Sequence, residues 1–177
     1  MDNLESIKFT YKHRKVVDFL AKKYLSKEEY EEIYHQIKLH DFDKMMSYLF
    51  YPRETCKIIH RENNAHHLEN NKTRTRLDYL EMIFDWESAR YTKPDKPLNA
   101  YETLEKFYKN EEEHLLPLLK ELHLDKENTK PEEDVVRYVS TLNDELDNIK
   151  AEFIDIIDYM FNREKNREQK IKKYDFK

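Results

Sequence analysis

The sequence predicts an all-α protein, and three observations support this fold class. The 177 residues include no glycine, so tight hairpin turns that need a positive φ have no suitable residue. Apolar residues recur every three or four positions over most of the chain, which is the spacing of amphipathic helices. Although 39% of the residues are charged, 13% are aromatic, and these supply large apolar surfaces that disordered chains usually lack. We therefore expect a folded helical protein with charged outer faces.

Two helices are predicted in the first forty residues. The first covers about residues 4–24 and turns these side chains inward: Phe9, His13, Val16, Val17 and Leu20. Ser26 caps the second helix, and Glu29 completes a capping box three residues later. The apolar stripe of this second helix, which leads directly to His40, consists of Tyr30, Ile33 and Ile37.

The middle of the chain reads as one short helical segment and two longer helices. The short segment covers about residues 42–50 and ends before Pro52, which cannot continue a helix. A helix then starts near residue 53 and weakens at the polar pair 63–64. A stronger helix covers about residues 74–91, and its apolar face is formed by Leu77, Leu80, Ile83 and Phe84.

Two further helices are predicted over about residues 100–110 and 111–124. Asn99 is a suitable N-cap for the first of them. The second must accommodate Pro117, which lacks a backbone donor, so we expect a kink or a break there.

The C-terminal part predicts one long helix from Pro131 to about Asn166. Its apolar positions alternate spacings of three and four, as in a helix packed along another helix, and they are Val139, Leu142, Leu146, Ile149, Phe153, Ile156 and Met160. Two alternatives remain for this seam. It packs on the protein's own helices, or it forms a homodimer.

Charge and cysteine content exclude several classes of protein. The net charge of −5 gives no strong signal for nucleic-acid binding, and without glycine there is no Gly-rich phosphate loop. The single Cys56 fits a reducing compartment. No signal-peptide core and no apolar run of about 18 residues is present, so we expect a soluble cytoplasmic protein with no membrane partner.

Histidines concentrate near the N-terminus, since six of the eight lie in the first 67 residues. His13 shares the apolar face of the first helix, and His40 ends the apolar stripe of the second. Asp41 follows at once, so a nitrogen and an oxygen ligand can reach one point, and Lys44 lies one turn beyond it. Imidazole with carboxylate is a ligand set suited to Fe, Mn, Zn or Ni.

The positions of three further candidates are open from the sequence. His60 and His67 are two helical turns apart on one face, or the weak pair 63–64 lets His66 or His67 enter by a separate turn. Asp85 lies away from the apolar face of its helix, together with Asp78 and Glu81. Either that flank lines a polar site, or Asp85 is a surface residue.

These residues resemble a known pattern. The ordered set His13, His40-Asp41 and Asp85 is similar to the H…HD…D signature of the HD superfamily of metal-dependent hydrolases. The stretch HDFDK at 40–44 resembles the HDxxK motif of the HD-GYP branch, and the pair at 66–67 resembles its paired histidine. Residues 40–91 also look like a family of small bacterial and phage proteins. The similarity covers about residues 1–125.

The resemblance implies an HD-domain-like helical bundle over residues 1–125, and residues 126–177 are then a long helix that packs on it or mediates dimerisation. It also implies a centre with one or two divalent transition-metal ions. The first ion would be held by His13, His40, Asp41 and Asp85. Asp41 would bridge to a second ion held by His60 with His66, His67 or both.

The expected activity is phosphoester hydrolysis on a small phosphorylated substrate such as a nucleotide. Asp41 and Lys44 are the expected catalytic residues. Lys44, Arg61 and Arg74 are expected to bind the substrate phosphate. Two alternatives are a di-iron oxygenase of the HD type and a non-catalytic helical interaction protein that uses the long C-terminal helix.

Overall fold

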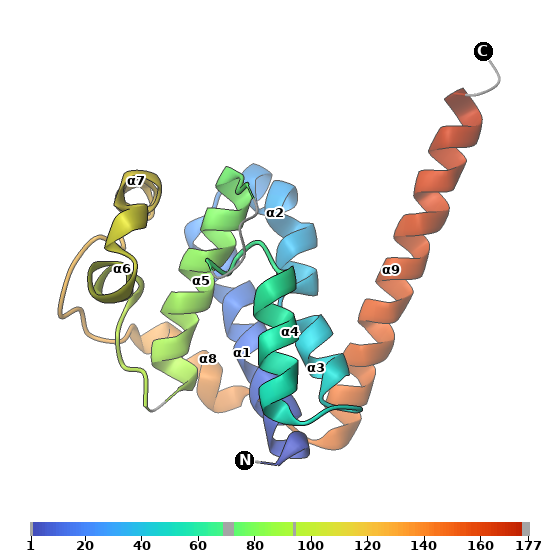
Figure 1. Cartoon of the computed structure of the whole chain (residues 1–177), viewed down its shortest axis with the longest axis horizontal. Coiled ribbons are helices and arrows are strands. Elements are labelled where there is room, and N and C mark those ends of the chain that lie inside the picture. The colour runs from blue at the N-terminus through green and yellow to red at the C-terminus, as the bar shows by residue number, and fades with distance from the viewer. Residues whose placement is uncertain (1, 69–72, 94, 175–177) are drawn as a thin grey trace. The chain divides into compact units, whose positions relative to one another are not determined.

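The structure is a computed structural model that describes residues 2–68, 73–93 and 95–174, with side chains described up to residue 163. Within these ranges every regular element is a helix and no strand occurs, which confirms the predicted all-α class (Figure 1). In chain order the elements are α1 (Asn3–Tyr24), α2 (Lys27–Leu39), α3 (Phe42–Ser47), α4 (Arg53–Asn63), α5 (Arg76–Thr92), α6 (Ala100–Phe107), the 3-10 helix η1 (Lys109–Glu111), α7 (Glu112–Glu121), α8 (Glu133–Thr141) and α9 (Leu146–Tyr174). None of these helices is both long and apolar enough to span a bilayer.

The chain divides into two compact units, Met1–Leu142 and Asn143–Lys177. The first unit therefore includes α8, whereas the N-terminal domain predicted from the sequence ends at residue 125. α8 belongs to this unit because Val135 is fully buried in its core and because α8 packs against α1 and α5. The second unit consists of α9 and the residues around it.

α1 and α5 form the centre of the first unit, where they lie side by side (Figure 1). α1 also packs against α2, α3 and α8, and α5 packs against α2, α6, α7 and α8. Fully buried side chains on both helices include Val16, Leu20, Leu80 and Phe84. Each contributes on the order of 1.5–3 kcal/mol when it leaves water, so this helix pair is a stable frame.

Capping boxes fix the starts of three helices. In each, the N-cap side chain accepts a hydrogen bond from a backbone N–H three residues later, and that residue's side chain accepts one in return. The pairs are Ser26 with Glu29, Thr75 with Asp78, and Asn99 with Glu102. The predicted caps at Ser26 and Asn99 are confirmed.

Two predictions of helix continuity are wrong. The long helix expected from residue 131 is interrupted, because α8 ends at Thr141 and α9 begins at Leu146. At the interruption the Asn143 side chain accepts a hydrogen bond from the backbone N–H of Glu145 (2.9 Å), a local contact that competes with helical hydrogen bonding. Conversely, α7 continues through Pro117, so the helix does not break there.

Candidate metal centre

Five segments of the first unit bring histidine and carboxylate side chains to one cluster. They are α1, the turn between α2 and α3, the end of α4, the loop after α4, and α5. The side chains form three overlapping groups, and within each group one ligand atom per residue lies within 4.8 Å of the others. The residues are His13, His40, Asp41, His60, His66, His67, Glu81 and Asp85. All but Glu81 are sequence candidates.

The turn at Asp41 places a carboxylate in the middle of this cluster. Asp41 has a left-handed backbone (φ 54°) and precedes α3, yet its side chain makes no capping hydrogen bond. The carboxylate instead turns inward: Oδ1 lies 2.8 Å from His60 Nε2 and 3.8 Å from His66 Nε2. Oδ2 accepts a hydrogen bond from Lys44 Nζ at 2.7 Å. A left-handed conformation costs an L-residue about 1–2 kcal/mol, so the surroundings must hold this turn in place.

Arg14 is the residue that holds the turn. It follows His13 on α1 and is buried, and its guanidinium donates hydrogen bonds to the backbone oxygens of His40 and, at 2.8 Å, of Lys38. Carbonyl groups at the end of a helix lack hydrogen-bond donors within the helix. At the end of α2, the guanidinium of Arg14 is such a donor. The position of His40-Asp41 is thus coupled to that of His13.

The first ligand group consists of His13, His40 and Asp85. His13 Nε2 lies 2.8 Å from Asp85 Oδ1 and 3.5 Å from His40 Nε2, and His40 Nε2 lies 4.0 Å from the same Asp85 oxygen. The side chain of Asp85 is only 14% exposed. The sequence left open whether Asp85 lies at the surface or in a polar site. In the structure it lies in a polar site, which this flank of α5 lines.

The second ligand group consists of Asp41, His60, His66 and His67. α4 ends at Asn63, so His66 and His67 lie in the following loop and not on the same helical face as His60. Their rings are 4.4 Å apart, and the His67 ring lies 4.8 Å from that of His60. The second ligand group therefore depends on a loop as well as on helices.

Arg74 anchors that loop. Its Nε donates to the backbone oxygen of Ala65 at 3.0 Å, and one terminal nitrogen donates to that of His67 at 2.7 Å. The guanidinium therefore positions the loop backbone, which differs from the substrate-binding role expected from the sequence. Arg61, the other arginine expected to bind substrate, is exposed on α4.

Outer hydrogen-bond partners orient the histidine rings. His13 Nδ1 lies 2.9 Å from Ser88 Oγ, and His60 Nδ1 lies 2.9 Å from Asp43 Oδ2. Glu81 Oε1 lies 2.8 Å from His40 Nδ1 and 3.0 Å from His66 Nδ1. An acceptor at Nδ1 leaves Nε2 as the atom that faces the centre of the cluster.

Glu81 and Asp43 were not assigned roles from the sequence. A signal was present for each, since Glu81 precedes Asp85 by one helical turn and Asp43 lies two residues after Asp41. A carboxylate near a candidate ligand is too common to be selected on spacing alone, because most such residues are exposed.

The donor set fits divalent ions. Although His60 Nε2 lies close to Asp41, the buried Nε2 atoms of His60 and His66 make no hydrogen bond of normal geometry to any described residue. Buried polar atoms are nearly always satisfied, so these two nitrogens indicate a further ligand. Imidazole nitrogens together with carboxylate oxygens are typical ligands of Zn, Mn, Fe and Ni.

The carboxylates of the centre hold negative charge strongly. Burial alone raises the pKa of Asp41 and Asp85. Neighbouring positive groups at Asp41, and at Asp85 chiefly the hydrogen bond with His13, outweigh it and bring both pKa values well below the usual range. For Asp41 the strongest of these groups is Lys44. Burial likewise raises the pKa of Glu81, but His66 and His40 lower it to about 2. Asp41, Glu81 and Asp85 are thus ionised at neutral pH and favour a cation between them.

The histidines divide into two kinds. Burial lowers the pKa of His13 to about 4 and that of His67 to about 3, so both are neutral at pH 7. Burial also lowers the pKa of His60 and His66, but for these residues the negative charges of Asp41 and Glu81, respectively, outweigh it and raise the pKa. His60 and His66 therefore hold a proton more tightly than His13 and His67 do.

A second lysine that sequence reasoning missed lies near the centre. Lys93 follows α5, and its Nζ lies 5.6 Å from the centre of the Phe9 ring, which itself stacks on His13 at 6.2 Å. Burial lowers the pKa of Lys93, and its charge contributes to the lowered pKa of Asp85. Lys44 and Lys93 are thus two cations near this centre.

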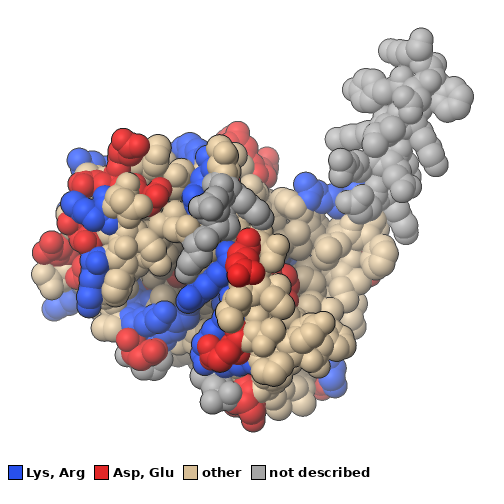
Figure 2. Space-filling view, viewed as in Figure 1, with Lys and Arg blue, Asp and Glu red and all other residues tan. Residues whose placement is uncertain are grey.

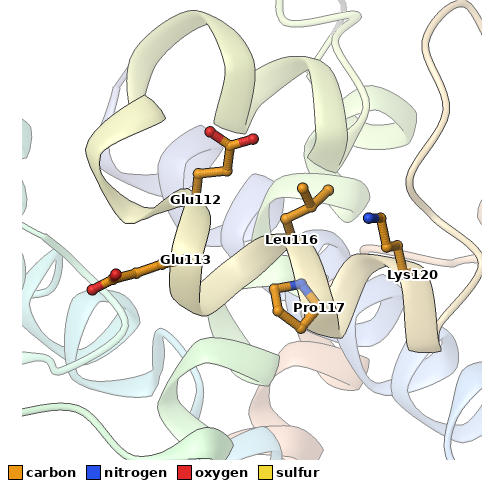
Figure 3. A pocket seen from close by; sticks show the side chains of 5 residues that line it. All are labelled: Glu112, Glu113, Leu116, Pro117 and Lys120. Carbon is orange, nitrogen blue, oxygen red and sulfur yellow. The ribbon is translucent and has the colours of Figure 1, made fainter.

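The remaining surface shows no second cluster of this kind among the described residues. A shallow hollow on α7, drawn in Figure 3, shares no residue with the centre and is lined by Glu112, Glu113, Leu116, Pro117 and Lys120. On the face shown in Figure 2, acidic and basic side chains of the described residues are interspersed, without a broad basic area. This charge pattern does not indicate a nucleic-acid interface on that face.

No protein-family model matches the sequence, and neither a curated protein nor a solved structure matches it.

Proposed function

We propose that this protein is a metal-dependent phosphohydrolase of the HD type, which acts on a small phosphoester such as a nucleotide. The observation that carries the proposal is the position of Asp41. Its Oδ1 faces the second ligand group and lies 4.0 Å from His40 Nε2 of the first, while Oδ2 is held by Lys44. The resemblance of residues 40–44 to the HDxxK motif supports the same reading.

Two ions would be held by the two ligand groups. His13, His40 and Asp85 would hold one, and the histidines of the second group would hold the other, with Asp41 between them. Divalent ions at such a centre supply Lewis acidity and lower the pKa of a bound water toward neutrality.

The charges of this chain define what the centre accepts. Four carboxylates lie in it or touch its histidines, Asp41, Asp43, Glu81 and Asp85, against the two ammonium groups of Lys44 and Lys93. Two divalent ions cancel the four carboxylates, and the two lysines then favour a phosphate dianion.

The experiment that tests the proposal measures turnover and ion content together. Wild type with Mn²⁺ is expected to hydrolyse p-nitrophenyl phosphate or bis(p-nitrophenyl) phosphate. Asp41→Asn, which removes a charged ligand, should lose bound ion and reduce turnover by more than about a hundredfold. His114→Ala is the matched control, because His114 is an exposed histidine outside the cluster. A full ion content in Asp41→Asn, or no turnover by wild type, would contradict the proposal.

A di-iron oxygenase is the second candidate function. The observation in its favour is the number of imidazoles, since five of the seven residues in the two ligand groups are histidines, a set that suits iron. Ion analysis of protein purified without added metal separates the two. Two irons with a visible absorption band favour oxygenase chemistry, whereas turnover of a phosphoester with Mn²⁺ favours hydrolysis.

A further inference from the structure

Glu81 lies outside both ligand groups, yet its carboxylate contacts the Nδ1 atom of one histidine in each of them. It lies 2.8 Å from His40 Nδ1 in the first group and 3.0 Å from His66 Nδ1 in the second, through the same oxygen, Oε1. By contrast, the histidine contact of Asp43 is with His60, and that of Ser88 is with His13. The two ligand groups thus share one outer partner.

The core fixes the backbone at Glu81. It is 5% exposed, and its neighbours on α5, Leu80, Met82 and Ile83, are fully buried. It also precedes the candidate ligand Asp85 by one helical turn, so the same helix, α5, carries both carboxylates on one side. Rotation of Glu81 away from the histidines would leave a buried carboxylate without partners, which is strongly unfavourable.

We propose that Glu81 couples the two ion sites, by holding one imidazole of each with Nε2 directed at its ion, so that the two ions are taken up together. The inference rests on the proposed ion centre. Binding of an ion to His66 would fix its ring, and through Oε1 it would fix Glu81 and then His40. The ordering of His40 is then already complete when the second ion binds, which is positive cooperativity without a change of fold.

A third ion among Glu81, His40 and His66 is a different reading of the same cluster, since their ligand atoms also lie close together. Separations of 2.8 and 3.0 Å are those of charge-assisted hydrogen bonds between nitrogen and oxygen. An ion at this place would need both Nδ1 atoms as ligands, while the Nε2 atoms of the same rings face the other groups. The hydrogen-bonded arrangement leaves Nε2 free for one ion each.

The test is a titration of Co²⁺ into chelator-treated protein, followed by calorimetry and by the visible absorption of the ion. Wild type is expected to take up two equivalents in one cooperative transition. Glu81→Gln retains an oxygen that accepts hydrogen bonds but loses the charge, so both ions should bind about tenfold more weakly and in separate steps. Glu81→Met, which removes the acceptor, should weaken both by about a hundredfold.

Asp43→Asn is the matched control, because it removes the same charge from a carboxylate that orients only one histidine. It should weaken one ion and leave the other unchanged. Circular dichroism and thermal unfolding establish that each variant is folded, and Glu81→Asp, which keeps the charge on a shorter side chain, replaces Glu81→Met if the latter does not fold. It should weaken both ions by less than the hundredfold expected for Glu81→Met.

The outcomes are distinguishable. If Glu81→Gln binds both ions as wild type does, or weakens only one of them, the coupling is wrong and the proposed function is untouched. If wild type binds no Co²⁺, the ion centre itself is wrong, and the coupling with it. If both ions bind to wild type but no phosphoester is hydrolysed, the proposed function is wrong while the Co²⁺ titration still decides the coupling.

Discussion

Asp41 shows how one residue links backbone conformation to chemistry. Its left-handed backbone is a conformation that aspartate and asparagine adopt more readily than other non-glycine residues, and this chain has no glycine to use instead. The turn directs the carboxylate away from α3 and toward the histidines. Asparagine tolerates the same backbone, which makes Asp41→Asn a test of charge and ligation without a change of the turn.

The titration of the histidines predicts a pH dependence of ion binding. His60 and His66 hold protons more tightly than an ordinary histidine, because Asp41 and Glu81 outweigh the effect of burial on their pKa. Ion binding needs neutral imidazole, so uptake near pH 6.5 should release on the order of one to two protons, and affinity should fall as the pH falls. Calorimetry in two buffers of different ionisation enthalpy measures the release. Uptake without proton release, at an affinity equal at pH 6 and pH 8, would contradict this assignment.

The same pKa shifts make the free energy of unfolding depend on pH. The raised pKa of His60 and His66 stabilises the fold below the ordinary histidine value of 6.5, and this contribution is lost as pH rises through the folded-state pKa. The lowered pKa of Glu81 acts in the opposite sense, since its contribution is lost as pH falls from 4.5 towards about 2.

Lys93 provides a second prediction at the level of single residues. Lys93→Gln should weaken competitive inhibition by inorganic phosphate by about tenfold, because one of the two cations near the centre is lost while the ligands remain. Ion content should stay at the wild-type level. Lys96→Gln is the control, since Lys96 is exposed and lies three residues further along the chain. Equal inhibition constants for the two variants would exclude a role for Lys93 in phosphate binding.

Among the elements, the loop after α4 depends most on a single contact, the guanidinium of Arg74. Arg74→Lys keeps the charge but cannot donate to Ala65 and His67 in the same planar arrangement. We expect faster hydrogen exchange at residues 65–68 and weaker binding of the ion at the second ligand group. Arg76→Lys is the control, because Arg76 pairs with exposed Glu29 and Glu121. Unchanged exchange in Arg74→Lys would show that the loop is held by other contacts.

The elements also show what the sequence could predict. The spacing of apolar residues predicted α1, α2 and α5 because each has one face in the core and one in water. The interruption between α8 and α9 was missed because Leu142 and Leu146 keep the helical spacing across it. Periodicity reports which residues share a face, and it does not report whether the backbone between them is continuous.

The candidate site was predictable only in part, for a related reason. Motif order brought forward His13, His40-Asp41 and Asp85, and the structure places their side chains together. The partners that orient the rings, Glu81 and Asp43, depend on contacts between segments distant in sequence. Spacing along one helix cannot supply such contacts.

At the scale of the whole molecule, the division after Leu142 predicts which part of the chain holds the centre. Residues 1–142 should fold and bind ions as the full chain does. Residues 1–130 should be unstable because this fragment lacks α8. That helix contributes Val135, which is fully buried, and the partly buried Tyr138, whose ring stacks on that of Phe19 at 4.3 Å. Thermal unfolding and ion titration of both fragments provide the measurement. Loss of ion binding on removal of residues 143–177 alone would contradict this division.

The central claim is that this helical unit holds two ions on either side of Asp41. Anomalous scattering from crystals of the protein grown with Mn²⁺, recorded on both sides of the metal's absorption edge, tests it most directly. We predict two anomalous peaks, one among His13, His40 and Asp85 and one among His60, His66 and His67, with Asp41 between them. An absence of anomalous density at these side chains, in crystals that diffract well enough to show them, would contradict the account.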